Sequence, residues 1–276
     1  MKKPILAITT ADKNNFNYAV MMLNSLRKFH DWPAILVTDE VDPEKLKLLP
    51  KDVEVKDLTV YIKNDPHFFY RQKPILMEEY IKDYEVVLGL DSDQIITGSL
   101  DYILETKDYD VAGVLNYNAL DAQQYGVVQG WGINPIEYVN CGLVAVRSEK
   151  FVHEWYVWAF SPQFERMQYK EQDGLNIKIY HGNWNCRILD HGDEPAKMHA
   201  VWGLFGKSHW NKAILQDDKL IIPKDEADLI FSKYDTEIKV LHWAGGNGSP
   251  EKMQYRTRFS DDIIERIDYL VSDTVK

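Results

Sequence analysis

Residues 85–93, EVVLGLDSD, decide the interpretation of this sequence. The apolar run that ends at Leu90 is typical of a central strand covered on both faces of a parallel sheet. Asp91 and Asp93 follow this strand directly, and side chains at positions i and i+2 project to the same side. Two carboxylates placed in this way can converge on one hard cation such as Mn²⁺ or Mg²⁺. Because ligands of open α/β sheets collect at the carboxyl ends of the strands, this pair marks a candidate site.

Short apolar runs and amphipathic helical patterns alternate before this segment. Residues 5–10, 34–40 and 53–58 have the composition of strands. Apolar side chains at helical spacing predict a helix over 16–30, and a second helix is predicted over 73–84. We therefore predict an α/β fold with a Rossmann-like, mostly parallel sheet flanked by helices.

The rest of the chain is less regular. The runs with strand character are 110–115, 139–146, 219–223 and 239–244, and those with helical character are 151–160, 170–180 and 261–271. Residues 117–138 are rich in glycine and aromatic side chains, and we interpret them as a loop that could serve as a lid or an acceptor platform. We predict a single domain over 1–276, with 1–115 as its nucleotide-binding half and 116–276 as its acceptor and sugar half.

The composition excludes several classes of protein. The 276 residues include 32 Lys and Arg against 43 Asp and Glu, for a net charge of -11, and contain no basic tract that would track a phosphate backbone. We therefore expect no nucleic-acid partner. We also expect no membrane span, because no segment approaches the roughly twenty apolar residues that one requires. Two cysteines, Cys141 and Cys186, cannot build a disulfide framework and suit a reducing compartment, which favours a cytoplasmic location.

An Asp-x-Asp pair after an apolar strand has other interpretations. The triplet is a common surface turn, so the preceding strand carries much of the argument. Phosphatases of the haloacid dehalogenase type also place two aspartates after a hydrophobic strand, the first as a nucleophile. In those enzymes the motif usually opens the domain, whereas three strand-like runs precede it here, and Ile95 stands where they have Thr. That enzyme class is kept as the alternative.

Further polar segments lie in order around this pair. They are ITTAD (8–12), YRQKP (70–74), YVNCGLVAV (138–146), EQDGLN (171–176) and LHWAGG (241–246). Together with the Asp-x-Asp pair, this series resembles glycosyltransferase family 8, the GT-A-fold group that includes glycogenin and bacterial galactosyltransferases. The resemblance extends from Ile5 to about Lys252.

The resemblance implies a donor site at the carboxyl ends of the first strands. It assigns the nucleotide to residues that follow these strands, namely Thr9, Thr10, Asp12, Asp91 and Ser92. It makes Asp91 and Asp93 metal ligands and His242 the third ligand. Arg71, with Lys73 nearby, corresponds to a family arginine that contacts the donor sugar or phosphates.

The resemblance also implies the sugar subsite and the catalytic groups. Asn140 would bind sugar hydroxyls, and Gly142 would allow close backbone approach. Glu171, Gln172 and Asp173 would lie beneath the transferred sugar as the catalytic set. Cys141 replaces the family's usual Ala, and we interpret it as a small buried hydrophobe.

The last segment, LHWAGG (241–246), matches the family pattern, but the residues that follow it differ from that pattern. The amide of Gly245 would meet the diphosphate. Three residues later the family has a lysine where this chain has Gly248, so Lys252, Arg256 or Arg258 would have to neutralise the phosphates.

These observations predict a metal-dependent glycosyltransferase that moves a sugar from a UDP-hexose to an acceptor hydroxyl, using Mn²⁺ or Mg²⁺, and the resemblance implies that the transfer retains the anomeric configuration. The acceptor is left open among carbohydrate, protein and lipid, and so is the oligomeric state. Four tryptophans are candidates for stacking on sugar rings, with Trp131 the strongest among Trp131, Trp202, Trp210 and Trp243. A nucleotide-sugar or carbohydrate-binding protein without turnover is the non-enzymatic alternative.

Overall fold

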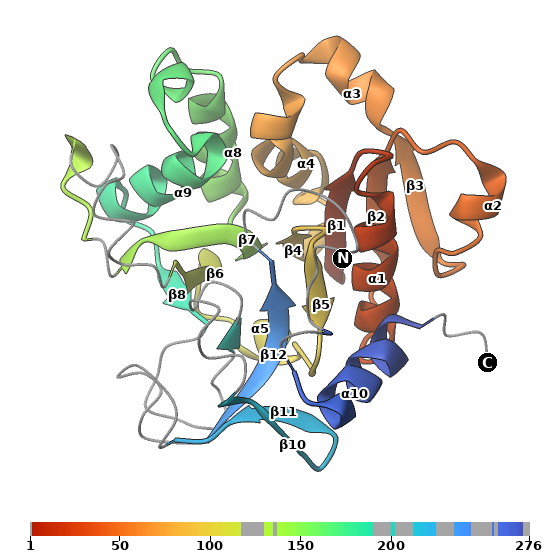
Figure 1. Ribbon diagram of the computed structural model, residues 1–276. Coiled ribbons are helices and arrows are strands. Elements are labelled where there is room, and N and C mark those ends of the chain that lie inside the picture. The colour runs from red at the N-terminus through yellow and green to blue at the C-terminus, as the bar shows by residue number, and fades with distance from the viewer. Residues whose placement is uncertain are drawn as a thin grey trace.

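A seven-stranded sheet forms the centre of the protein (Figure 1). The computed structural model describes residues 2–116, 130–134, 137–189, 200–201, 212–224, 235–243, 256 and 259–272. The strands of this sheet are β1 (Lys3–Ala11), β2 (Ala34–Thr38), β3 (Val53–Asp57), β4 (Tyr84–Leu90), β6 (Val111–Leu115), β7 (Val139–Val146) and β8 (Cys186–Ile188).

The strand order of this sheet is β3-β2-β1-β4-β7-β6-β8. The first four are parallel to one another, and β8 is parallel to β6. Only β7 runs antiparallel to its neighbours β4 and β6. The prediction of a mostly parallel α/β sheet is therefore confirmed. The strand β7 lies between two strands of the predicted nucleotide-binding half, so both predicted halves contribute to one sheet.

Alternation along the strands divides the core between the two faces of the sheet. On β1, Ile5 and Ala7 belong to one hydrophobic cluster, while Leu6 and Ile8 belong to another, as the period of two of a strand requires. The first face is covered by α1 (Phe16–Arg27). The second face is covered by three helices, α4 (Gln72–Tyr80), α8 (Glu149–Ala159) and α9 (Lys170–His181).

A second, smaller sheet was not anticipated. Its strands, in the order β10-β11-β12-β5, are β10 (Ile214–Gln216), β11 (Lys219–Ile222), β12 (Thr236–His242) and β5 (Gln94–Ile96), and β9 (Ala200–Val201) pairs with β12. The C-terminal helix α10 (Asp261–Val271) shares a hydrophobic cluster with this sheet and contacts α1. The sheet matters for function because β12 is antiparallel to β5 with His242 opposite Gln94, which brings the end of β12 beside the Asp-x-Asp turn.

Several element boundaries differ from the predictions. The strand predicted over 53–58 ends at Asp57, whose carboxylate accepts a hydrogen bond from the Thr59 amide and caps α3 (Leu58–Asn64). The helix predicted over 73–84 ends at Tyr80, because β4 already begins at Tyr84. The remaining short helices are α2 (Pro43–Leu46), η1 (Phe68–Tyr70), α5 (Tyr102–Glu105) and η3 (Phe164–Arg166).

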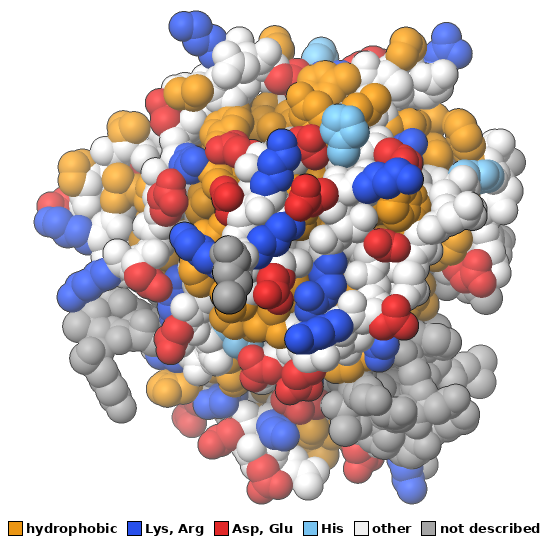
Figure 2. Space-filling model, turned by 180° about the vertical axis from the view of Figure 1, so that it is seen from behind, with side chains coloured by type: hydrophobic (Ala, Val, Ile, Leu, Met, Phe, Trp, Pro, Cys, Tyr) orange, Lys and Arg blue, Asp and Glu red, His pale blue; other side chains and the backbone are white. Residues whose placement is uncertain are grey.

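The charges on one face of the molecule and the character of its helices can be compared with the charge and hydropathy of the sequence. Seen from behind, the described part of the molecule mixes Lys and Arg with Asp and Glu side chains, without a broad area of one sign (Figure 2). None of the helices in the described part has the length and apolar character needed to cross a bilayer. Most of the predicted loop 117–138 lies outside the described residues.

Candidate functional site

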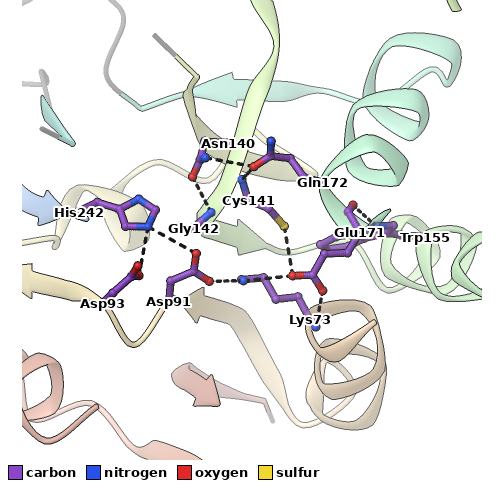
Figure 3. A network of polar contacts seen from close by, with 10 residues as sticks. All are labelled: Lys73, Asp91, Asp93, Asn140, Cys141, Gly142, Trp155, Glu171, Gln172 and His242. Atoms are coloured by element: carbon purple, nitrogen blue, oxygen red, sulfur yellow. Dashed lines mark hydrogen bonds and ion pairs between the residues drawn. The ribbon is translucent and has the colours of Figure 1, made fainter. Parts of the chain in front are cut away.

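Three potential metal ligands meet where the two sheets join. Asp91 and Asp93 form the turn between β4 and β5, and His242 is the last residue of β12. The His242 Nε2 atom lies 3.5 Å from Asp91 Oδ2 and 3.3 Å from Asp93 Oδ1, as Figure 3 shows. One ligand atom from each residue lies within 4.8 Å of the others. The structure thus brings together all three predicted metal ligands.

The environment of His242 fits a bound cation. The residue is 1% exposed, and neither ring nitrogen has a hydrogen-bond partner among the described residues. The Nε2 atom nevertheless faces the two carboxylates at 3.3 and 3.5 Å, and a divalent cation held between the imidazole and the carboxylates would take the place of the proton on this atom. Burial alone would lower the pKa of His242, but the Asp93 and Asp91 carboxylates outweigh it and raise the pKa to about 9.

Gly142 on β7 makes room for the imidazole ring. A Cβ atom at this position would lie 2.2 Å from His242 Cε1 and 2.8 Å from Asn140 Oδ1. Asn140 Oδ1 in turn accepts a hydrogen bond from the Gly142 amide at 2.7 Å. The close backbone approach predicted at Gly142 therefore exists, and the group that it admits in this structure is the His242 ring.

Lys73 connects the metal ligands to α9. Its Nζ lies 2.5 Å from Asp91 Oδ1 and 3.3 Å from Glu171 Oε1, and its backbone amide donates to Glu171 Oε2 at 3.1 Å. Only 7% of the lysine side chain is exposed. Burial opposes its charge, but the Asp91 and Glu171 carboxylates hold the pKa of Lys73 well above its usual range. Burial likewise opposes the charge of Asp91, and Lys73 and His242 outweigh it, so the pKa of Asp91 is lowered.

A second network fixes the amide of Gln172. Its Oε1 accepts hydrogen bonds from Asn140 Nδ2 at 3.0 Å and from the Cys141 amide at 2.9 Å, while its Nε2 donates to the Tyr138 hydroxyl at 3.3 Å. These partners, from β7 and the residue before it, determine which way the amide points. Gln172, Asn140 and Cys141 lie side by side next to the Lys73–Glu171 pair in Figure 3.

Two neighbouring cavities share Asp91. One, of about 270 Å³, is lined by the predicted nucleotide residues Thr10, Asp12 and Ser92, with Asp91 and Asp93. The other, of about 320 Å³, is lined by Lys73, Glu171 and Gln172. Asp91, Phe69 and Gln72 line both cavities. Asp91 thus borders both a cavity at the end of β1 and a cavity beside α9, whereas Asp93 lines only the first of them.

No family model matches the chain, and no curated protein matches it in sequence. Solved structures do match. A galactosyltransferase, LgtC, determined with donor and acceptor sugar analogs, superposes with a TM-score of 0.64 over 98% of this chain and 97% of its own, at 16% identity.

Other enzymes share the architecture. Mouse xyloside xylosyltransferase 1 covers 90% of this chain and 99% of its own, with a TM-score of 0.54 and 14% identity. The bifunctional glycosyltransferase WbbM matches 94% of this chain over 52% of its own length, with a TM-score of 0.58 and 13% identity. The chain has the GT-A fold. The resemblance inferred from the sequence is thereby confirmed at the level of the fold.

Arg71 is held by contacts within the protein in this structure. Its guanidinium pairs with Asp65 at 2.9 Å and with Glu165 at 2.5 Å, and lies over the Phe160 ring at 4.8 Å. Lys73, two residues later, is the basic group of this segment that contacts Asp91. The sequence offers both Arg71 and Lys73 as basic groups near the site. Which of them contacts Asp91 depends on the direction in which each side chain leaves the start of α4. A contact of Arg71 with the donor stays a prediction.

Asp173 lies behind the cavity. It is fully buried, with Oδ1 accepting from the Tyr138 hydroxyl at 2.6 Å and Oδ2 from the Tyr169 amide at 2.8 Å. Glu171 and Gln172 line the cavity beside α9. In this conformation Asp173 supports the first turn of α9, and a direct catalytic role for it stays a prediction.

Two residues predicted to hold the nucleoside, Asp12 and Thr9, differ in their contacts. Asp12 Oδ1 accepts hydrogen bonds from the amides of Asn14 and Asn15 and so orders the entry to α1. Thr9 is 3% exposed, and its hydroxyl has no partner among the described residues. Cys141 is buried, and burial raises the pKa of its thiol well above the usual range.

The remaining predicted residues either lie outside the described residues or have contacts elsewhere in the protein. Gly245, Lys252, Arg258, Trp202 and Trp210 lie outside the described residues. Arg256 pairs with Asp268 on α10 at 2.7 Å. Trp131 packs edge-on against the His181 ring at 5.4 Å, and Trp243 is 9% exposed. Roles for these residues toward phosphate or sugar stay predictions.

Proposed function

We propose that this protein is a metal-dependent glycosyltransferase that moves a hexose from a UDP-hexose to an acceptor hydroxyl. The observation that carries the proposal is the cluster of Asp91, Asp93 and His242 on the GT-A fold, in which Asp91 lines both cavities. A nucleoside in the cavity with Thr10 and Ser92 would place its diphosphate at the acidic pair. The sugar would then extend toward Glu171 and Gln172.

The proposed cation is Mn²⁺ or Mg²⁺, held by Asp91, Asp93 and His242. Oxygen ligands suit both ions, and a single imidazole is compatible with them. When bound, such an ion would stabilise the negative charge that develops on the leaving diphosphate. Lys73 holds the other oxygen of Asp91 at 2.5 Å and so fixes the orientation of this carboxylate.

The proposed transfer needs few groups from the protein. The acceptor oxygen forms a bond to the anomeric carbon while the bond from that carbon to the phosphate oxygen breaks. The hydroxyl proton passes to the departing phosphate oxygen. Gln172, whose amide is fixed by Asn140 and Cys141, would hold the sugar in the orientation for this attack.

The carboxylates near the sugar cavity favour attack from the side of the leaving group, with retention. A covalent route, which would also retain the configuration, would require a carboxylate nucleophile beneath the sugar ring, and an inverting route would require a free carboxylate as the base for the acceptor hydroxyl. Here Glu171 is held by two nitrogens of Lys73, and Asp173 is enclosed between Tyr138 and Tyr169. Proton NMR of the first product formed would reveal its anomeric configuration, and an inverted product would contradict this part of the proposal.

The phosphatase alternative finds less support. It requires Asp91 as a nucleophile, whereas both oxygens of Asp91 face cations or potential cations, Lys73 and His242. In a phosphatase of this type the two aspartates usually follow the first strand of the domain. Here they follow β4 of a GT-A fold that is shared with solved glycosyltransferases.

The cytoplasmic location remains a prediction from composition.

A donor screen tests the proposal without knowledge of the acceptor. Purified protein would be incubated with UDP-glucose, UDP-galactose and other UDP-sugars, with and without Mn²⁺, and released UDP would be measured. We expect slow hydrolysis of one donor that needs the metal and falls by about 100-fold or more in Asp93→Asn. Asp83→Asn, an exposed residue just before β4 at the opposite end of that strand, is the matched control and should retain activity.

Calorimetry with UDP separates the possible results. Affinity that rises with Mn²⁺ supports the donor site, and hydrolysis in addition supports catalysis. Metal-dependent affinity without turnover of any donor would favour the non-catalytic binding protein. No cation-dependent affinity for UDP would overturn the proposal.

A further inference from the structure

Aromatic side chains gather at the cavity beside α9. In the described part of the chain, five large aromatic residues are exposed, and three of them, Phe69, Tyr70 and Tyr169, line this one cavity. Tyr70 is 54% exposed and Tyr169 39%. Exposed aromatic rings that converge on a concave site indicate a ligand-binding surface rather than ordinary surface variation.

The backbone around Tyr169 is held in an unusual conformation. Lys170, the next residue, has a φ of 42°, in the left-handed region that a lysine rarely adopts. The buried Asp173 carboxylate accepts the Tyr169 amide at 2.8 Å, and Asp173 is itself held by the Tyr138 hydroxyl. Such a conformation persists where its surroundings impose it, and it is found preferentially at ligand sites. The position of Tyr169 at the cavity is therefore a built feature of the α9 N-terminus.

The polar groups of the same cavity indicate the chemistry of the ligand. Gln72, Gln168 and Lys170 line it together with the tyrosines. The Lys170 ammonium already donates to the Glu165 carbonyl oxygen at 2.8 Å, but a lipid chain would leave the side-chain amides of Gln72 and Gln168 facing an apolar ligand, at a cost in free energy. A pyranose ring offers hydroxyls to such groups and an apolar face of C–H bonds to an aromatic ring, as amphipathic tyrosines require.

The arrangement separates this site from the nucleotide. Tyr70 and Tyr169 line only the cavity that contains Glu171 and Gln172, whereas Phe69 also lines the cavity of Thr10 and Ser92. We propose that Tyr70 and Tyr169 bind a pyranose ring of a carbohydrate acceptor at the mouth of the larger cavity. This inference rests on the proposed transfer reaction, because it assigns the acceptor side of the same site. It selects a carbohydrate among the acceptor classes that the sequence leaves open.

Saturation-transfer NMR with lactose, maltose and cellobiose tests the inference in the presence of UDP and diamagnetic Mg²⁺. We expect saturation of the ring protons of at least one of these sugars by the wild-type protein. Tyr70→Ala and Tyr169→Ala should each reduce this signal by about 3- to 10-fold, the loss of an aromatic contact. Tyr70→Phe and Tyr169→Phe keep the rings and should retain most of it.

Matched measurements keep the test specific. Tyr269→Ala removes an equally exposed tyrosine, 55% exposed and on α10, and should leave the signal unchanged. Calorimetry should give each tyrosine variant the UDP affinity of the wild type. The inference is overturned if no sugar is saturated although UDP binds, if both alanine variants retain the signal, or if their UDP affinity falls in parallel. Failure of the proposed function is a separate result, because UDP would then not bind the wild-type protein at all.

Discussion

Lys73 Nζ lies 2.5 Å from Asp91 Oδ1, and this contact joins the predicted metal site to the first turn of α9. The other oxygen of Asp91 faces His242 at 3.5 Å, while Lys73 also contacts Glu171. The residues for the cation and those for the sugar therefore form one electrostatic network. A change in any member should affect both the stability and the binding properties of the site.

Lys73→Met should destabilise the protein and abolish activity. It leaves the Glu171 and Asp91 carboxylates without their cation, and loss of one partner of a buried pair is costly. Because a third of the Asp91 side chain is exposed, we expect a loss of about 2 kcal/mol in the free energy of unfolding, below the range for fully buried pairs. Urea denaturation measures it. Lys82→Met, at an exposed position after α4, is the control, and equal stability of the two variants would contradict the interpretation.

His242→Ala should weaken binding of Mn²⁺ while UDP can still enter the site. Removing one of three protein ligands should reduce metal affinity by about 10- to 100-fold, as judged from the effects of changes around metal sites. Electron paramagnetic resonance of free Mn²⁺ during a titration gives the affinity directly. His153→Ala, which alters a histidine with 60% of its side chain exposed, should bind Mn²⁺ as the wild type does. Wild-type affinity in His242→Ala would remove this residue from the site.

Gly142→Ala should displace the imidazole ring of His242. The added methyl group would lie 2.2 Å from Cε1, so the ring or the strand must move. Overpacking of this kind costs about 1 to 3 kcal/mol, and we expect weaker Mn²⁺ binding as well. Gly130→Ala adds a methyl group where no atom lies within 4 Å and should change neither property. Thermal unfolding with and without Mn²⁺ provides both comparisons.

Asp173→Asn distinguishes a supporting role from a direct one. The carboxylate accepts from Tyr138 and from the Tyr169 amide, and an amide can accept on only one of its two atoms. We expect a loss of about 1 to 3 kcal/mol in stability. Tyr138→Phe removes one of these donors without altering the carboxylate, and it should cause a smaller loss together with a parallel fall in donor hydrolysis. Full activity in Tyr138→Phe with none in Asp173→Asn would instead indicate a direct role for Asp173.

His30 should make the stability depend on pH. Burial lowers its pKa from 6.5 to about 4, outweighing the nearby Asp101. Its Nε2 accepts a hydrogen bond from the Leu100 amide at 2.8 Å, so the neutral ring carries its proton on Nδ1. Protonation of Nε2 would break this contact. The folded state therefore favours the neutral form, and the unfolded chain binds a proton first as the pH falls.

The sign of the effect follows from these two pKa values. The contribution of His30 is fully present above pH 6.5 and is lost as the pH falls toward 4. The loss should reach roughly 2 to 3 kcal/mol. Urea denaturation from pH 7 to pH 4.5 measures it, with His30→Gln as the comparison because glutamine can accept from Leu100 without titrating. An identical pH dependence in the two proteins would contradict the assignment.

Local patterns predicted most of the first sheet. The apolar runs at 5–10, 34–40 and 85–90 are strands, and the helical spacing over 16–30 corresponds to α1. These elements are accessible because hydrophobic periodicity is a property of neighbouring residues. The runs at 219–223 and 239–244 fall on β11 and β12, but their assembly into a second sheet was not predicted, because β5 is only three residues long and is defined by its pairing with β12, far along the chain.

By itself, the sequence determined the α/β class and the proximity of Asp91 to Asp93, because the two residues belong to one short turn after a strand that its apolar run identifies. Tertiary structure decided that Lys73 contacts Asp91 while Arg71 pairs with Asp65, and that the Asp173 carboxylate is bound by Tyr138 and the Tyr169 amide. It also brought His242 to the site through the pairing of β12 with β5. These outcomes depend on packing between residues that lie far apart in the sequence. Such packing decides, for example, which of two basic side chains in one segment, Lys73 or Arg71, contacts Asp91.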